Sequence, residues 1–537
     1  MQVKFKYMRL STYHVVLLIY IAWMSFGVFP LVCYEGDSLH IITGCSLMCE
    51  HGLSFPPQYS YAYDMQPLVT YVVVLLRYLF VFLTCEQIYC LLSAFASLVF
   101  SLGCIRLVST YVDVGKTLVF LSLFLIPESY GCGMYANSSV LAGSVFIWGC
   151  CMLVSGKWKF ACLLLAVAPL LRIDILLVYP SLLFLFMLNG HTLRKSFIYS
   201  LYLLVFIVAF VWMGCSVLGA NPLKTTLLDY ADMVEQKHFS KYIPLTVYSF
   251  YTIVNIPLLI IGISLFVRLK QYRLLAFVVV PIVLLHFFFR HSGCATKHYL
   301  YLIPFVMVLT SKALSAVKTC MDNSKLIKLS VSVLLLLYLF VSVRFPFRNT
   351  PSANVAGSVA TLGPNKVLFT ETFTPYHFTF GIGAGRVVPT FDEMMLLSGN
   401  AFYPFFIREY KEMLLESRAN VCEVLDSQDS AIVVNVGWES SAFYPLPWID
   451  VAGHDCELVE SDPYALRVTG NARDITFLTC KIDYGYAYVT DFLERMPRGK
   501  QVYVTPEFSS PYMLDSLAAG GLLTKVCPRV YKLTQNH

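Results

Sequence analysis

Long apolar runs recur through the first 345 residues of this chain, and they constrain its fold more than any other feature. A helix that crosses a bilayer needs about 20 mostly apolar residues. Runs of about that length, some shorter, predict about eleven spans: His14–Val32, Leu68–Leu83, Ile88–Val108, Leu118–Ile126, Met134–Val154, Phe160–Leu188, Phe197–Leu218, Leu245–Val267, Leu274–Phe289, Tyr299–Leu309 and Ile327–Val343. The run at 160–188 is too long for one straight helix. A kinked span or a tight pair is expected there, and a pair would make twelve.

The charge content agrees with a lipid environment. Only 13% of the 537 residues are charged, whereas an ordinary soluble protein has about 25%. Disordered, coiled-coil and nucleic-acid-binding chains need more charge or polarity, so these classes and a nucleic-acid partner are excluded. The chain is predicted to be a polytopic α-helical membrane protein whose surroundings are mostly membrane lipids.

A basic start precedes the first run, with Lys4, Lys6 and Arg9 ahead of His14. The run is too long for the apolar part of a cleaved signal peptide and lacks a small-residue cleavage site, which indicates a signal anchor. Basic residues favour the cytoplasmic side, so residues 33–66 are predicted to form the first outer loop. Most later basic loops agree with this orientation. Two pairs fit it less well: Arg106 with Lys116, and Lys157 with Lys159.

The chain changes character after the last run. From about residue 351 the apolar stretches shorten to strand length and are separated by turn-forming residues. These stretches are Lys366–Thr370, Ala431–Val436, Asp474–Leu478 and Gln501–Thr505. The pattern predicts a transmembrane region over residues 1–348 and a C-terminal soluble α/β or α+β domain over residues 349–537. An odd number of spans places that domain on the outer, periplasmic or lumenal, side.

Two acidic residues, Glu35 and Asp37, follow the first span directly. The C-terminal end of a helix is the unfavourable end for a carboxylate, because the helix dipole is already negative there. One interpretation is ordinary interfacial charge, which an aqueous loop tolerates. The other is a general base at the membrane surface, where a lipid-linked substrate presents its headgroup.

A cationic group lies late in the transmembrane region, at Arg290, His291, Lys297 and His298, followed by Tyr299. The predicted topology puts this group in an outer loop, against the tendency of basic residues to stay inside. Such an exception indicates an anionic ligand, and a lipid-linked phosphate would fit because lysine and arginine bind phosphate oxygens strongly. An inverted topology, with these residues as cytoplasmic anchors, is the alternative.

Arg172 and Asp174 lie inside an apolar run. A charge at the bilayer centre costs about 2.5–3.5 kcal/mol on insertion scales, and such residues usually face a cavity or each other. Arg172 is therefore either a phosphate contact or one half of a local pair at a kink.

The first outer loop resembles that of the GT-C superfamily of membrane glycosyltransferases, most closely the protein-mannosyltransferase and aminoarabinose-transferase branch. In that branch the loop has an Asp-Glu pair, a helix, a glycine and a final Pro-Pro-Leu. The counterparts here are Asp37, the segment Ile41–Glu50, Gly52 and Gln66–Leu68, with Ser38 in place of the Glu and glutamine in place of the first Pro. The stretch from Lys297 to Pro304 and the position of Arg172 are similar to further family features.

The resemblance implies a sugar donor carried on polyprenyl phosphate and an acceptor that is a lipid, a glycan or a protein. Asp37 would be the general base, with Glu35 as its alternative. The residues expected to contact the donor or its lipid phosphate are Asp64, Gln66, Arg172, Arg290, Lys297, His298 and Tyr299. No cofactor is required in this mechanism, although Glu35 and Asp37 are spaced to hold a divalent ion such as Mg²⁺ or Mn²⁺.

A multi-span transporter or lipid flippase, with the intramembrane charges lining a pathway, is the competing function. The chain shows no inverted hydropathy repeat, and a large one-sided tail is unusual for a carrier. The absence of a retention signal and a single weak glycosylation sequon favour a bacterial inner membrane, with the endoplasmic reticulum membrane as the alternative.

Overall fold

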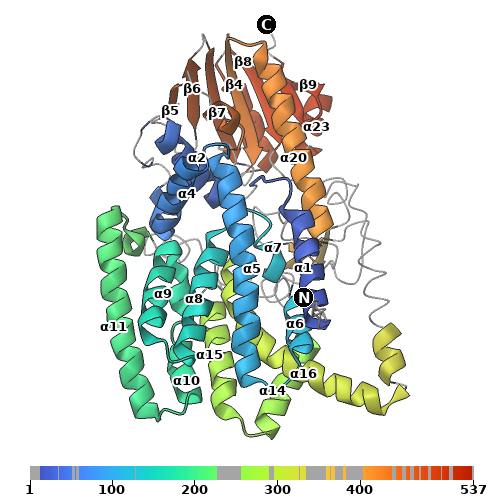
Figure 1. Cartoon of the computed structure of the whole chain (residues 1–537). Helices are drawn as coiled ribbons and strands as arrows, with labels where there is room; N and C mark the ends of the chain where they lie inside the picture. The colour runs from blue at the N-terminus through green and yellow to red at the C-terminus, as the bar shows by residue number, and fades with distance from the viewer. Residues whose placement is uncertain are drawn as a thin grey trace, which may run out of the picture.

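The computed structural model of the chain consists of a helical region and a sheet domain, stacked end to end (Figure 1). It describes the following residues: 12–33, 36–50, 52, 55, 60–126, 128–225, 255–288, 296–325, 327–333, 359–362, 365–368, 379–381, 403–437, 443–449, 455–459, 465–470, 473–481, 485–497, 499–506 and 512–534. The predicted boundary at 348/349 lies outside the described residues.

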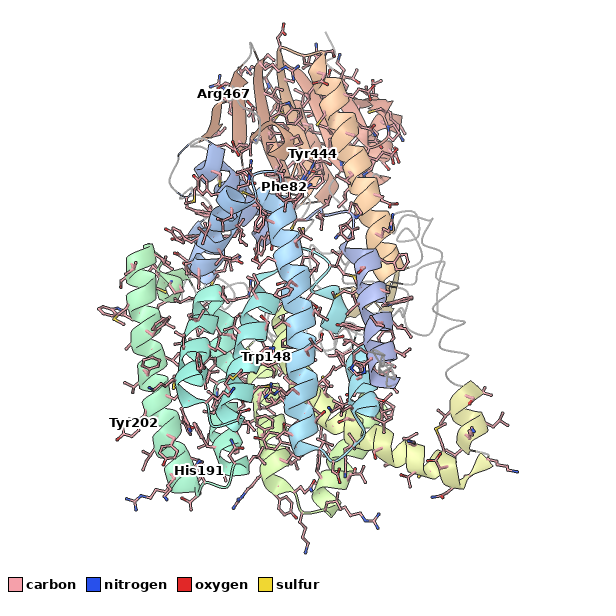
Figure 2. All side chains as sticks on the ribbon, viewed as in Figure 1. Phe82, Trp148, His191, Tyr202, Tyr444 and Arg467 are labelled. Carbon is pink, nitrogen blue, oxygen red and sulfur yellow. The ribbon has the colours of Figure 1, made fainter. Side chains whose placement is uncertain are left out.

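The helical region is built from apolar helices: α1 (Thr12–Val28), α5 (Cys85–Tyr111), α6 (Lys116–Phe124), α8 (Ser138–Val154), α9 (Trp158–Leu171), α10 (Ser181–Leu188), α11 (Leu193–Leu218), α14 (Asn255–Arg268), α15 (Tyr272–Phe288) and α16 (Ile303–Asn323). In the described part of the chain, three helical stretches are long and apolar enough to cross a membrane, and six shorter apolar helices accompany them. On α11, Tyr202, Trp212 and Val217 are at least 70% exposed. Figure 2 shows Tyr202 on the outer side of that helix. Such a surface suits lipid, not water.

The long apolar run at 160–188 forms two helices, α9 and α10, joined by a 3₁₀ helix, η2 (Ile173–Val178). Pro169 lies in the last turn of α9, and proline has no N–H to give to the carbonyl four residues earlier. That carbonyl, on Leu165, accepts a hydrogen bond from the Tyr179 hydroxyl at 2.5 Å instead. The run is therefore the tight pair, and Arg172 sits at the break.

The predicted span at 68–83 is wrong. Its counterpart, α4 (Pro67–Leu79), is 13 residues long and lies beside α2 (Gly36–Glu50), between the sheet and the nearer ends of α8 and α9 (Figure 1). The backbone N–H of Cys33, after α1, donates to Glu86 Oε1 at the start of α5 at 3.0 Å. Both residues lie at the same end of the helical region. The chain between them therefore cannot contain a single membrane span, which would put them at opposite ends. Hydropathy alone did not reveal this return.

This correction removes the conflict among the basic loops. With α4 outside the membrane, α5 becomes the second span. Its C-terminal end contacts the loops that follow α8 and α10. Arg106 Nη2 donates to Ser155 Oγ at 3.5 Å, and the Tyr111 hydroxyl donates to Asn189 Oδ1 at 2.9 Å. The two pairs that fitted poorly therefore lie at one end with the other basic loops. Within the described residues, splitting 160–188 adds one helix, and α4 removes the span predicted at 68–83.

The sheet domain holds a seven-stranded sheet of order β5-β6-β7-β4-β8-β10-β9. Its strands are β4 (Ser430–Gly437), β5 (Asp455–Leu458), β6 (Leu466–Gly470), β7 (Arg473–Lys481), β8 (Gln501–Pro506), β9 (Leu523–Cys527) and β10 (Val530–Leu533). The central strand β4 pairs in parallel with β7 and β8, whereas the outer pairs are antiparallel. Three of the four predicted strands become β4, β7 and β8, and β2 (Asn365–Leu368) overlaps the fourth.

Helices cover both faces of this sheet. Alternate residues of β4 point to opposite sides: Val434 packs in a cluster with α22 (Gly485–Glu494) and α23 (Tyr512–Ala519). Val433 belongs to a larger cluster that contains residues of α20 (Tyr403–Asp426) and continues into the helical region. Figure 1 shows α20 beside α1 at one end and along the sheet at the other. A separate three-stranded antiparallel sheet consists of β1 (Val359–Leu362), β2 (Asn365–Leu368) and β3 (Thr379–Gly381).

The chain is therefore a polytopic α-helical membrane protein with a C-terminal soluble domain, as predicted, and the domain is of the α/β type.

Candidate active site

A buried ion pair lies at the break between α9 and η2. Arg172 caps α9 in an extended conformation, with φ −165° and ψ 120°, and its Nε donates to Asp174 Oδ2 at 2.9 Å. The Tyr301 hydroxyl donates to the other oxygen of Asp174 at 2.8 Å, and Arg172 Nη1 donates to Ser138 Oγ at 3.0 Å. Four side chains from four elements thus fix one cation and one anion inside the protein.

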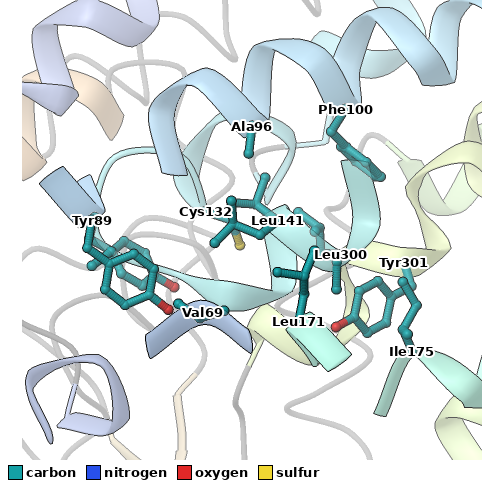
Figure 3. Close-up of a cluster of buried hydrophobic side chains, with 14 of the residues drawn as sticks. Val69, Tyr89, Ala96, Phe100, Cys132, Leu141, Leu171, Ile175, Leu300 and Tyr301 are labelled. Atoms are coloured by element: carbon teal, nitrogen blue, oxygen red, sulfur yellow. The ribbon is translucent and has the colours of Figure 1, made fainter. Parts of the chain in front are cut away.

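The surroundings of the pair are apolar. Figure 3 shows Tyr301 with its hydroxyl next to Leu171, close to Leu300 and Ile175, and all four of these side chains are buried. Electrostatic interactions act more strongly in such a medium than in water. The structure thus shows the local pair at a kink, which is one of the two alternatives that the sequence left open, and the role of Arg172 as a phosphate contact stays a prediction.

Asp37 lies within electrostatic range of Arg172. It occupies the first turn of α2 and is partly exposed, and its carboxylate is close enough to the Arg172 guanidinium to interact with it electrostatically. The sequence placed Asp37 at the unfavourable end of the first span. The structure instead starts a new helix at Gly36, so Asp37 lies at a helix N-terminus, where the dipole stabilises a carboxylate.

The predicted basic group is only partly described. A 3₁₀ helix, η3 (Thr296–Leu302), carries the backbone of Lys297 and His298 together with Tyr299 and Tyr301. Tyr299 is buried, and its ring stacks on His286 of α15 at 4.8 Å between centroids. The side chains of Lys297 and His298, and residues Glu35 and Arg290, lie outside what the structure describes. Because η3 packs against both α8 and η2, its backbone lies beside the Arg172 site.

Asp64 and Gln66 make structural contacts. Asp64 accepts hydrogen bonds from the Asn221 backbone N–H at 2.8 Å and from the Thr225 hydroxyl at 2.6 Å. Gln66 Oε1 accepts from the Tyr89 hydroxyl at 3.1 Å, inside the protein. Asp64, in α3 (Ser60–Met65), thus binds the segment after α11, and Gln66, which caps α4, binds α5. The structure therefore gives both residues contacts away from the Arg172–Asp174 pair, and their predicted role in binding the donor stays a prediction.

Two members of the site were missed at the sequence level. Tyr301 stands in the same stretch as Lys297 and His298, so that motif contained it without revealing its role. Ser138 belongs to the Asn137-Ser138-Ser139 sequon, but Asn137 is buried and caps α8 by accepting from the Ser139 N–H at 2.8 Å. A buried polar residue at a helix start, such as Ser138, indicates a site only when the break between α9 and η2 beside it is already known.

Among the described residues, no group of three or more histidine, cysteine, aspartate and glutamate side chains is arranged to hold a metal ion. The best-placed carboxylates are Asp37 and Asp174, and Asp174 already accepts from Arg172 and Tyr301. The expectation that no metal ion is required stays a prediction.

No family profile matches this sequence, and no curated protein matches it. Solved structures do. The fold is similar to that of ArnT from Cupriavidus metallidurans bound to undecaprenyl phosphate, with a TM-score of 0.55 and 11% identity over 97% of each chain. The same protein in the apo state gives a TM-score of 0.52, 12% identity and the same coverage.

The archaeal oligosaccharyltransferase AglB from Archaeoglobus fulgidus, in complex with an inhibitory peptide and a dolichol-phosphate, gives a TM-score of 0.42 and 12% identity. The match covers 92% of this chain and 69% of AglB. The likeness to ArnT over nearly the whole of both chains shows that this chain has the same membrane fold as ArnT.

Proposed function

We propose that the protein is a membrane glycosyltransferase that moves a sugar from a polyprenyl-phosphate donor to an acceptor at the outer membrane face. The observation that carries the proposal is the electrostatic interaction of Asp37, at the start of α2, with the buried and paired Arg172, in a chain with the fold of ArnT. ArnT is recorded with undecaprenyl phosphate bound, which supports a polyprenyl-phosphate carrier here. The sheet domain and the outer end of α1 lie on the same side, which we assign to the periplasm or lumen.

In this mechanism Asp37 is the general base. It takes the proton from the acceptor hydroxyl as the acceptor oxygen attacks the anomeric carbon of the donor. The bond between that carbon and the phosphate oxygen breaks, and polyprenyl phosphate leaves with the bonding electron pair. Partial exposure of Asp37 gives the acceptor access to it from the aqueous side. A single displacement of this kind inverts the configuration of the sugar.

Arg172 would orient the donor phosphate, and its own orientation is set by Asp174, Tyr301 and Ser138. Arg290, Lys297, His298 and Tyr299 are proposed to hold the leaving phosphate, because cations placed where negative charge develops lower the barrier. The position of η3 against α8 and η2 supports this assignment. The neutralised phosphate then has no need of a metal ion.

The test is transfer of a labelled sugar from polyprenyl-phosphate donors, with the purified protein in lipid and a panel of hexoses and pentoses. Asp37→Asn keeps the size of the side chain and removes the base, so we expect transfer to fall by about 10²–10⁴-fold. Glu50→Gln is the matched control, because Glu50 lies at the other end of α2 and pairs with Arg77. Full activity of Asp37→Asn would remove Asp37 from the mechanism and leave Glu35 as the base to test.

A further inference from the structure

Two buried basic side chains of the sheet domain reach into the outer end of the helical region. Both come from α20, where Lys411 is 0% and Arg418 is 8% exposed. They are seven residues apart, or two helical turns, so they lie on one side of the helix. This side of α20 faces α1 and the start of α5.

Arg418 pairs with Glu86 in the first turn of α5. Arg418 Nη1 donates to Glu86 Oε2 at 3.0 Å and Nη2 donates to Oε1 at 3.2 Å. The guanidinium also stacks on the Phe443 ring at 3.7 Å. Such a two-point contact fixes both position and orientation of the partners.

Glu86 is also bonded to the chain just before the proposed base. Its Oε1 accepts the backbone N–H of Cys33 at 3.0 Å, and α2, which carries Asp37, begins at Gly36. The carboxylate of Glu86 thus binds both the sheet domain, through Arg418, and the segment before α2, through the backbone of Cys33, which lies three residues before that helix.

Lys411 makes a second connection of the same kind. Its Nζ donates to the carbonyl of Val28, the last residue of α1, at 2.9 Å and also to the carbonyl of Met134. Met134 lies four residues before Ser138, which contacts Arg172. Lys411 therefore joins the segments that lead to both halves of the candidate active site.

The body of α2 is held as well, because α21 (Leu446–Ile449) of the sheet domain packs against it. A buried ion pair gives little net stability compared with an apolar pair of the same shape. Packing alone therefore does not explain why charged side chains lie between the sheet domain and the helical region. Directed bonds to Cys33, Val28 and Met134 do explain them, since an apolar side chain cannot accept or donate such bonds.

We propose that Glu86, Arg418 and Lys411 are positioning residues that set the place of Asp37, so that the C-terminal domain is a working part of the active site. The proposal rests on the assignment of Asp37 as the base. If these residues position Asp37, the C-terminal domain is necessary for the chemical step and not for donor binding.

The first variant is Arg418→Met, with Arg408→Met as its control. Arg408 lies on the same helix, where it is exposed and pairs with Glu412 at 2.9 Å. The readouts are kcat and KM for the donor, and amide hydrogen exchange of peptides covering residues 31–42. A 1 Å misplacement of a reacting group can cost about 100-fold, so we expect kcat to fall by about 10–100-fold with little change in KM. Exchange at 31–42 should rise in Arg418→Met and not in Arg408→Met.

A charge swap separates positioning from simple stability. The double variant Glu86→Arg/Arg418→Glu restores the ion pair, but arginine has no acceptor for the Cys33 N–H. If the pair only stabilises the fold, the swap rescues transfer; if it positions Asp37, transfer stays low and exchange at 31–42 stays fast. Glu86→Gln keeps an acceptor oxygen for the Cys33 N–H and should retain more activity than Glu86→Leu. This comparison replaces the charge swap if the swapped variant does not fold.

Unchanged exchange and unchanged kcat in Arg418→Met would overturn the proposal. So would full rescue by the charge swap. The exchange readout needs no donor, so it distinguishes the two possible failures. Absence of transfer in the wild type would overturn the proposed function, whereas wild-type exchange at 31–42 in Arg418→Met would overturn the positioning role alone.

Discussion

Two buried ion pairs do different work in this molecule. Arg172 and Asp174 are two residues apart, and their side chains are 5% and 4% exposed. Glu86 and Arg418 are 332 residues apart, with side chains 9% and 10% exposed. The first pair orients one cation at a break between helices, and the second joins the helical region to the sheet domain. Similar burial therefore does not mean equal function: we propose that the first pair belongs to the active site and that the second positions Asp37.

The largest effect on stability is expected from Arg172→Met. The variant leaves Asp174 buried without its cation, and removing one partner of a buried pair costs about 3–5 kcal/mol of the free energy of unfolding. Transfer should fall by about 100-fold or more, because the proposed phosphate contact is gone. Unfolding in lipid nanodiscs and the transfer assay measure the two effects separately.

The double variant Arg172→Met/Asp174→Leu sharpens that result. Replacing both ions by apolar side chains is often neutral for stability, so the free energy of unfolding should recover while transfer does not. Recovery of transfer in the double variant would mean that the pair is only structural, like an ordinary buried contact.

A smaller effect is expected from Tyr301→Phe, which removes the hydrogen bond to Asp174. A bond to a charged group contributes about 1.5–3 kcal/mol, and a neutral one about 0.5–1.5 kcal/mol. Tyr20→Phe is the matched control, because the Tyr20 hydroxyl is also buried but contacts Ser101 and the Ser129 carbonyl. We expect Tyr301→Phe to lose more unfolding free energy and to lower transfer. Equal losses of stability with unchanged transfer would exclude Tyr301 from the site.

The sequence predicted the local pair and not the distant one, for a physical reason. Arg172 and Asp174 are visible because charge within an apolar run is costly. Nothing in the chain near Glu86 indicates that it meets Arg418, since that contact depends on how the whole helical region is stacked on the sheet.

The same limit explains the error at α4. Hydropathy measures how apolar a stretch is, but the side of the membrane where it ends depends on contacts such as Cys33 with Glu86. The central strands were predicted because alternation and turn residues are local. The proximity of Asp37 to Arg172 could be expected only from the resemblance to GT-C enzymes.

A partly exposed group of three charges in the sheet domain should show the smallest stability effect. Asp474 accepts from Arg467 at 2.7 Å and Lys500 at 2.9 Å, and hydrogen bonding to Arg467 lowers the pKa of its carboxyl from 3.8 to about 2. Because the pKa is lower in the folded state, the stabilisation is present above about pH 4 and is lost as the pH falls towards 2. At neutral pH, Asp474→Asn should cost at most about 1 kcal/mol, since the group is partly solvated.

The check is unfolding of the full chain, wild type against Asp474→Asn, between pH 7 and pH 2. The difference in unfolding free energy should shrink with acidification. A difference that grows as the pH falls, or a cost like that of Arg172→Met, would contradict the contrast between the buried pairs and this partly exposed group.

Excess chelator is expected to have no effect on transfer. Protein cations are proposed to neutralise the leaving phosphate, so the rate in EDTA should stay within about twofold of the untreated rate. Loss of transfer that Mg²⁺ or Mn²⁺ restores would contradict this and would make Glu35 and Asp37 candidate metal ligands.

The central claim is that Asp37 carries the chemical step of sugar transfer, and single-turnover transfer in membranes reconstituted with labelled polyprenyl-phosphate sugar tests it most directly. The account predicts labelled acceptor from the wild type, and from Asp37→Asn a rate lower by about 100-fold or more with donor binding retained. Wild-type transfer by Asp37→Asn, or passage of intact donor across the bilayer without any transfer, would contradict it.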